Sequence, residues 1–124
     1  MRYLKARAGR LGATAEALAA GLLERQGYRV LARNYRCAIG EFDLIARDGN
    51  EIVFVEVRAR QAGGMVGPEE SITARKQQRV VRAAEHYLST QGMDDAARRV
   101  DVVAIEVDRT GRVVRAEHLR SAVQ

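Results

Sequence analysis

The sequence predicts a single α/β domain, residues 1–124, in which helices flank a central mixed sheet. Apolar residues recur at helical spacing near the start of the chain, and several later segments alternate in polarity or are rich in β-branched residues. The segment 100–107 is almost wholly apolar, as expected of a strand that is buried on both faces. A chain of this length can bury a hydrophobic core without disulfides or metals.

The first half of the chain predicts one helix and three strands. The helix ends at Gly27, a residue type that often terminates helices, and its apolar stripe comprises Leu11, Ala15, Leu18, Ala19, Leu22 and Leu23. Residues 28–35 predict a strand with a basic edge, residues 42–47 an alternating strand, and residues 52–58 a third strand. Between the last two strands, Asp48-Gly49-Asn50 is a strong turn signal.

The second half predicts a loop, a helix and one or two strands. Residues 59–68 contain three glycines and no periodicity, which indicates a loop. Ser71 or Thr73 can cap the following helix, whose buried stripe is Val80, Ala84, Tyr87 and Leu88. Residues 92–97 connect this helix to the strand at 100–107, and residues 113–118 can add an edge strand after the Thr110-Gly111 turn. The predicted order is α-β-β-β-α-β, with an extra edge strand as an option.

Composition points to a polyanionic partner. Lys and Arg number 21 against 16 Asp and Glu, and Lys5 and Lys76 are the only lysines. Arginine binds phosphate oxygens with a planar fork of donors, which suits nucleic acid, although a genome-wide preference for arginine explains the same composition. Cys37 is the only cysteine, which fits a reducing cytoplasm, and no Cys/His cluster has zinc spacing.

The first 25 residues resemble a signal peptide in part, because basic residues precede an Ala- and Leu-rich segment. Glu16 interrupts that segment, and Glu24 and Arg25 follow soon after it. No stretch approaches the roughly 20 apolar residues that a membrane span needs. We therefore expect a cytoplasmic protein with no membrane partner.

Acidic residues on the two central strands lie opposite one another in either two-residue hairpin. With Gly49-Asn50 at the tip, Asp48 pairs with Glu51 and Asp43 with Glu56. With Asp48-Gly49 at the tip, Glu41 opposes Glu56 instead. A three-residue turn would move one strand's acids to the other face and remove the pair.

Two carboxylates about 5 Å apart at Cβ repel by roughly 3 kcal/mol at an effective dielectric near 20. A buried pair therefore needs a compensating charge, and Mg²⁺ is typically held by one or two carboxylates with water and phosphate oxygens. The alternative is a solvated sheet face on which Arg58 and Arg60 neutralise the acids. Ile45 and Phe54 share that face, which indicates that a helix covers it.

These residues resemble the YraN-type family of uncharacterised bacterial proteins, over about residues 11–107. The resemblance is carried by Glu16, Arg33-Asn34-Tyr35-Arg36, Gly40-Glu41-Phe42-Asp43-Leu44-Ile45-Ala46, Val53-Phe54-Val55-Glu56-Val57-Arg58-Ala59-Arg60, Lys76 and Arg99-Val100-Asp101. That family in turn resembles the PD-(D/E)xK nuclease superfamily, particularly its Holliday-junction resolvase branch. The resemblance implies a restriction-endonuclease-like fold.

The resemblance also implies a site that uses Mg²⁺ or Mn²⁺. Asp43 and Glu56 would be the metal ligands, and Glu16 would be an auxiliary acid. The signature's lysine falls on Arg58, which can stabilise charge on a phosphate but cannot act as a base, so Lys76 is an alternative cation. Asp101 is expected to pair with Arg98 or Arg99 rather than bind metal. The nucleic-acid backbone, DNA more readily than RNA, would lie against Arg29, Arg33, Arg36, Arg75, Arg79 and Arg82.

Three functions follow. The first is a metal-dependent endonuclease that hydrolyses phosphodiester bonds, with branched DNA as a candidate substrate. The second is a nucleic-acid-binding module on the same fold with a weakened site, since arginine replaces lysine at position 58. The third is a protein-interaction domain whose edge strand at 113–118 pairs between two copies in a homodimer.

Overall fold

The computed structural model describes the backbone of residues 4–5, 9–62 and 74–123, and the side chains of residues 15–62 and 78–122. In chain order the elements are β1 (Leu4–Lys5), α1 (Gly9–Arg25), β2 (Arg29–Arg36), β3 (Glu41–Asp48), β4 (Glu51–Gln61), α2 (Ala74–Thr90), β5 (Ala97–Val107) and β6 (Val113–Val123). The predicted order of helices and strands is therefore confirmed, including the edge strand, and β1 is an addition.

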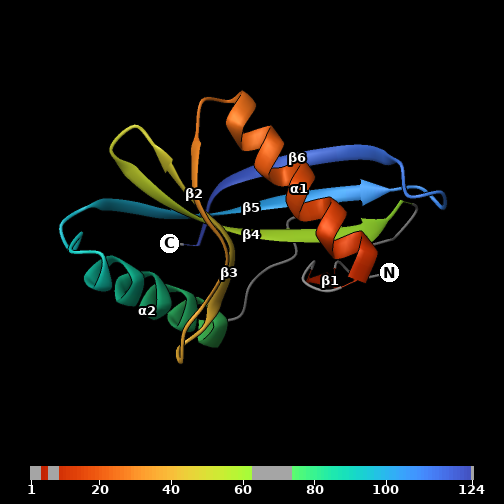
Figure 1. Ribbon diagram of the computed structural model, residues 1–124. Coiled ribbons are helices and arrows are strands. Elements are labelled where there is room, and N and C mark those ends of the chain that lie inside the picture. The colour runs from red at the N-terminus through yellow and green to blue at the C-terminus, as the bar shows by residue number, and fades with distance from the viewer. Residues whose placement is uncertain (1–3, 6–8, 63–73, 124) are drawn as a thin grey trace.

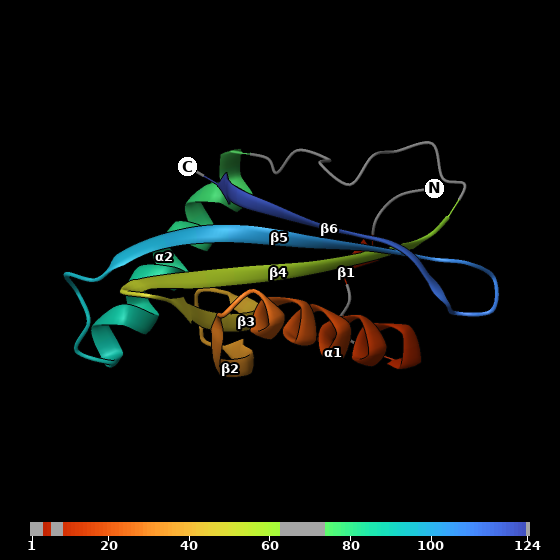
Figure 2. The same cartoon turned by 90° about the horizontal axis from the view of Figure 1, so that it is seen from above.

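The strands form one mixed sheet in the order β2-β3-β4-β5-β6, and β1 pairs with β4 outside this path. β4 and β5 are parallel, and the other neighbours are antiparallel. Parallel neighbours need a crossover connection, and α2 lies in it. Figure 1 shows α1 crossing in front of the sheet and α2 at the lower left of the view, and Figure 2 shows α1 running along one side of the sheet.

Alternate residues of the central strands pack against different helices. One core cluster joins α1 residues such as Leu23 to Leu44, Val53, Val55, Val57 and Val103. The other joins Ile45, Ile52, Phe54 and Val100 to Ala83, Ala84, Tyr87 and Leu88 of α2. The expectation that a helix covers the face of Ile45 and Phe54 is thus confirmed. We call the two sides of the sheet the α1 side and the α2 side.

The hairpin between β3 and β4 has the first of the two predicted registers. Asp48 pairs with Glu51, and Ile45 pairs with Phe54. Gly49 has a φ of 61°, a conformation that glycine adopts without steric cost. Continuing this register places Asp43 opposite Glu56, so the register that would oppose Glu41 to Glu56 and the three-residue turn are both wrong.

The prediction of a loop from residue 59 is wrong in its first part. β4 continues to Gln61, because its parallel pairing with β5 extends as far as Gln61 and Val107. Ala59 and Arg60 are buried there, which the glycine-rich sequence after them concealed. Residues 63–68 of that predicted loop, and the predicted caps Ser71 and Thr73, lie outside the described residues.

β6 is longer than predicted and forms one edge of the sheet. It pairs with β5, with register shifts near each end, and Ser121 has a positive φ of 51°. Bulges of this kind protect an edge strand from pairing with another chain. The homodimer through this strand stays a prediction.

Neither described helix has the length and apolar character that crossing a membrane requires.

Candidate functional site

Asp43 lies where β3 separates from β4. The last backbone pair between these strands is Leu44 with Val55. Further along β4, from Arg58, the same edge pairs with β1 instead. Glu56 and Val57 lie between these two stretches. The Val57 N–H donates to Oδ2 of Asp43 at 2.8 Å, and Asp43 is only 4% exposed. The carboxylate of Asp43 therefore lies near the plane of the sheet, where it replaces a missing strand partner.

Glu56 and Arg58 point to the α2 side, because they alternate with Val55 and Val57, which pack on the α1 side. Their side chains are 20% and 13% exposed, and Nη2 of Arg58 lies 3.4 Å from Oε2 of Glu56. Arg60 contacts Glu106 instead, at 2.5 Å. The predicted alternative in which Arg58 and Arg60 neutralise the acids is thus correct for Arg58 and Glu56, although this face is more buried than a solvated face would be.

The alternation of side chains breaks at the same position on β2 and β3. Arg33 pairs with Leu44 and Tyr35 pairs with Phe42, so Asn34 lies opposite Asp43. Leu44 belongs to the α1-side core, whereas Phe42 and Tyr35 pack on the α2 side. Asn34 has a φ of 53°, a left-handed conformation that costs a non-glycine residue roughly 1–2 kcal/mol. Both strands therefore turn at Asn34 and Asp43.

Glu16 of α1 is joined to this turn by Asn34. With the Asn34 amide oriented to donate, its nitrogen lies 3.1 and 3.0 Å from the two carboxylate oxygens of Glu16. Burial raises the pKa of Glu16, and the Asn34 hydrogen bond and the charge of Arg33 partly offset that rise. Glu16 is 7% exposed, so it is a buried residue and not part of the solvated surface of α1. Asn34 is among the residues that carry the family resemblance, but no sequence pattern assigned it a role.

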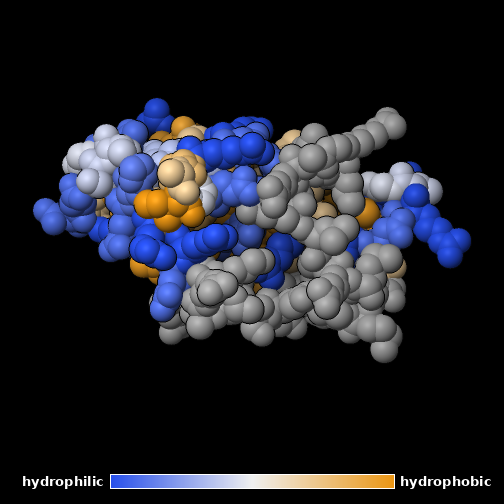
Figure 3. All heavy atoms as spheres, turned by 90° about the horizontal axis from the view of Figure 1, so that it is seen from below, coloured by the Kyte–Doolittle hydropathy of each residue, from blue (hydrophilic) through white to orange (hydrophobic). Residues whose placement is uncertain are grey.

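The predicted nucleic-acid contacts are divided between β2 and α2. Arg29, Arg33 and Arg36 of β2 are exposed, and Arg36 pairs with Glu41 at 3.3 Å between Nε and Oε2. Arg33 and Arg36 flank the turn at Asn34, whereas Arg29 lies nearer the other end of the strand. Arg79 and Arg82 are exposed on α2. Figure 3, seen from the side on which α2 lies, shows mainly hydrophilic side chains over the described residues.

The side chains of Arg75 and Lys76 lie outside the described residues, so Lys76 stays a predicted alternative to Arg58. Among residues 15–62 and 78–122, no three acidic, histidine or cysteine side chains gather closely enough to hold a metal ion. Asp43 and Glu56 offer two hard oxygen donors from adjacent strands. That donor set fits Mg²⁺ or Mn²⁺, which take one or two carboxylates and complete their shell with water or phosphate oxygens.

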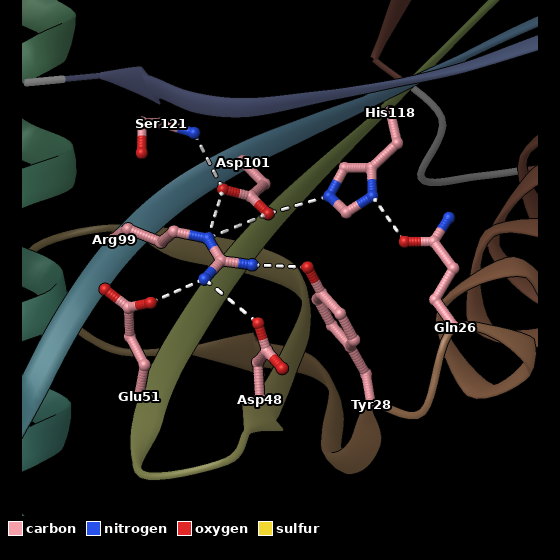
Figure 4. Close-up of polar contacts among 8 residues, drawn as sticks. All are labelled: Gln26, Tyr28, Asp48, Glu51, Arg99, Asp101, His118 and Ser121. Atoms are coloured by element: carbon pink, nitrogen blue, oxygen red, sulfur yellow. Dashed lines mark hydrogen bonds and ion pairs between the residues drawn. The ribbon is translucent and has the colours of Figure 1, made fainter.

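A second polar cluster, which the sequence did not reveal, is centred on Arg99 at the other end of the β3–β4 hairpin (Figure 4). Nη1 of Arg99 contacts Asp48 at 3.2 Å and Glu51 at 2.5 Å, and Nη2 donates to the Tyr28 hydroxyl. Its Nε donates to Asp101 at 3.0 Å. Arg99 therefore neutralises the opposed pair of carboxylates at the hairpin tip.

Asp101 is fully buried and accepts hydrogen bonds from three residues of this cluster, which are Arg99 of β5 and His118 and Ser121 of β6. His118 Nε2 lies 2.7 Å from Oδ2, and the Ser121 N–H lies 2.9 Å from Oδ1. Burial raises the pKa of Asp101, but the hydrogen bonds from His118, Ser121 and Arg99 outweigh it and hold the pKa below its ordinary value. The predicted pairing of Asp101 with an arginine is confirmed for Arg99, and Arg98 instead donates to the carbonyls of Asp94 and Ala96.

Comparison with known proteins agrees with the resemblance drawn from the sequence. A family model described as "Uncharacterised protein family UPF0102" matches residues 15–105. A UPF0102 protein of Moorella thermoacetica is 44% identical over 122 residues, which is 98% of this chain and 99% of the relative. Another from Chloroflexus aurantiacus is 49% identical over 115 residues, 92% of each chain, and one from Geobacter metallireducens is 41% identical over 114 residues, 92% of each chain. This chain belongs to the UPF0102 family, whose members are of the YraN type.

Proposed function

We propose that the chain is a metal-dependent endonuclease that hydrolyses phosphodiester bonds in nucleic acid, with DNA the favoured substrate. One observation carries the proposal: Asp43 and Glu56 lie on adjacent strands at the point where backbone pairing stops, and Arg58 lies next to Glu56. At this gap in strand pairing a carboxylate, and not a backbone carbonyl, accepts the Val57 N–H.

Asp43 and Glu56 are the residues that would hold Mg²⁺ or Mn²⁺. Such a cation supplies Lewis acidity and lowers the pKa of a bound water, which is the chemistry that phosphodiester hydrolysis requires. The Val57 N–H holds the Asp43 carboxylate in place before any ligand arrives. A carboxylate that is fixed in this way has less to reorganise when it receives a cation.

Arg58 would stabilise negative charge on the phosphate. It stays protonated at neutral pH, so it cannot remove a proton from the attacking water. Its contact with Glu56 at 3.4 Å is longer than a strong charge-assisted hydrogen bond, so a phosphate oxygen can compete for the guanidinium. The exposed arginines of β2 and α2 would bind the nucleic-acid backbone in a salt-sensitive way that carries little sequence information.

Cleavage of branched, flapped and single-stranded DNA, and of RNA, tests the proposal in Mg²⁺ and Mn²⁺. We expect cleavage of at least one substrate, and its loss in the variants Asp43→Asn and Glu56→Gln. Asp95→Asn is the matched control, because Asp95 is an exposed acid in the connection after α2. Absence of cleavage in both metals, or cleavage unchanged by Asp43→Asn, would refute the enzymatic function.

A nucleic-acid-binding module without cleavage is the second candidate. The observation that favours it is the arginine at position 58, which occupies the place of the signature's lysine and contacts Glu56. Such a module would bind nucleic acid with strong salt dependence and would be indifferent to divalent metal and to Glu56→Gln. Binding that strengthens with Mn²⁺ would count against this candidate and support the nuclease.

A further inference from the structure

Asn34, which lies near the candidate site, combines a left-handed backbone with a side chain that contacts the buried Glu16. Among the described residues, it and Ser121 are the non-glycine residues with positive φ. Strain of this kind persists where surrounding interactions over-determine the conformation, and it often occurs at functional sites. Ser121 is explained by its backbone N–H, which donates to Asp101. Asn34 needs an explanation of its own.

The backbone of Asn34 lies opposite Asp43 in the β2–β3 register. It is at this point that both strands change the face on which their side chains pack, with Leu44 on the α1 side and Phe42 on the α2 side. Without this turn, Asp43 would continue the ordinary alternation of β3. The turn at Asn34 and Asp43 therefore occurs where the Asp43 carboxylate accepts the hydrogen bond from the Val57 N–H.

The side chain of Asn34 contacts Glu16 of α1. Its amide nitrogen lies within 3.1 Å of both carboxylate oxygens of Glu16. Glu16 is buried, and the hydrogen bonds that its carboxylate accepts from Asn34 offset part of the cost of that burial. One residue thus contacts the acid of the helix through its side chain and faces the acid of the strand through its backbone.

We infer that Asn34 is a positioning residue that fixes Glu16 of α1 relative to Asp43 of β3, and thereby sets the affinity of the candidate site for a divalent cation. The inference rests on the proposed function, since it concerns the same site. Asparagine suits this position for two reasons: it tolerates the left-handed conformation better than most residues, and its amide donates to a carboxylate. Glycine satisfies the first requirement alone, and alanine satisfies neither.

The test is the affinity of the full chain for Mn²⁺, measured by titration with electron paramagnetic resonance of the free ion as the readout. The melting temperature of each variant is measured in parallel. Removal of a residue that orients metal ligands typically lowers metal affinity about 10–100-fold. We expect Asn34→Gly to weaken Mn²⁺ binding about tenfold or more while the chain remains folded, and Asn34→Ala to weaken it further. Asn50→Gly is the matched control, because Asn50 is exposed at the hairpin tip.

A double variant tests whether Asn34 acts through Glu16. In a Glu16→Gln background, Asn34→Gly should change Mn²⁺ affinity by less than about twofold, since residues that act together are not additive. Equal effects in both backgrounds would overturn the role of Glu16. Wild-type affinity in Asn34→Gly, even with a lowered melting temperature, would show a merely structural residue and overturn the inference alone. If the wild type does not bind Mn²⁺, or if Asp43→Asn binds Mn²⁺ as well as the wild type does, the proposed function fails too.

Discussion

Asp43 has a structural role and a proposed chemical role, and two substitutions separate them. Asparagine keeps an oxygen that can accept the Val57 N–H, but it loses the negative charge. Alanine loses both. The variants Asp43→Asn and Asp43→Ala should therefore differ in stability and agree in their loss of metal binding and cleavage.

The size of the stability difference follows from the Val57 contact. A buried backbone N–H that loses its acceptor costs about 1–3 kcal/mol. Asp43 is 4% exposed, so solvent is poorly placed to replace the carboxylate. For a chain of this length, a loss of about 2 kcal/mol lowers the melting temperature by roughly 6–12 °C. We expect Asp43→Ala to show this decrease and Asp43→Asn to show about half of it or less.

Thermal unfolding by circular dichroism measures the decrease, and hydrogen exchange of the Val57 amide locates it. The Val57 amide should exchange faster in Asp43→Ala than in Asp43→Asn, with the amides of α1 as the internal reference. Equal melting temperatures and equal Val57 exchange in both variants would refute the view that Asp43 replaces a strand partner. Retention of Mn²⁺ binding in Asp43→Asn would refute its role as a ligand.

Four further predictions concern the candidate site and the Arg99 cluster. Arg58→Lys should raise the cleavage rate in Mg²⁺ without changing the fold, because lysine restores a point charge that can lose its proton; a rate below that of wild type would show that the guanidinium itself is required. Arg99→Gln should lower the free energy of unfolding by about 3 kcal/mol in urea titrations, since it breaks a largely buried ion pair with Asp101; a change below about 1 kcal/mol would contradict this. The folded pKa of Asp101 lies below its ordinary value of 3.8. The carboxylate's contribution to stability is therefore complete above pH 3.8 and is lost as pH falls through the folded pKa. The free energy of unfolding of Asp101→Asn should depend less on pH below about 4 than that of the wild type. Burial raises the pKa of Glu16 above its ordinary value of 4.5, so ionisation of Glu16 destabilises the fold as pH rises from 4.5 through the folded pKa. We therefore expect Glu16→Gln to melt at a higher temperature than the wild type at about pH 7. A lower melting temperature would contradict this expectation.

The order of the strands along the chain was predictable because the strands carry clear periodic signals. The alternation of residues 42–47, the turn at Asp48-Gly49-Asn50 and the apolar segment 100–107 each led to an observed strand or hairpin. The end of β4 was not predictable in the same way. Ala59, Arg60 and Gln61 are ordinary loop residues in composition, and they belong to a strand because β5 pairs with them.

Choosing between the two hairpin registers required information that alternation does not contain. A shift of two residues keeps every side chain on its own face, so the hydrophobic pattern fits both. In the structure, Arg99 binds the carboxylates of Asp48 and Glu51, which are opposite one another in the observed register alone. Arg99 is 48 residues from Glu51 in the sequence, so local patterns could not reveal this contact.

The residues of the candidate site came from the family resemblance and their role stays a prediction, whereas their geometry was not predictable from the sequence. The resemblance gave Glu16, Asp43, Glu56 and Arg58 in order, but it did not show that Asp43 turns toward the edge of β4 to accept the Val57 N–H. That position depends on where two strands separate, which is a tertiary property. The left-handed conformation of Asn34 and its contact with Glu16 have the same origin.

A crystal soaked in Mn²⁺ and measured at the manganese absorption edge tests the metal site most directly. The account predicts one strong anomalous peak between β3 and β4, about 2 Å from a carboxylate oxygen of both Asp43 and Glu56, and no peak there in Asp43→Asn. An ordered site without such a peak at saturating Mn²⁺, or a peak that Asp43→Asn leaves unchanged, would contradict it.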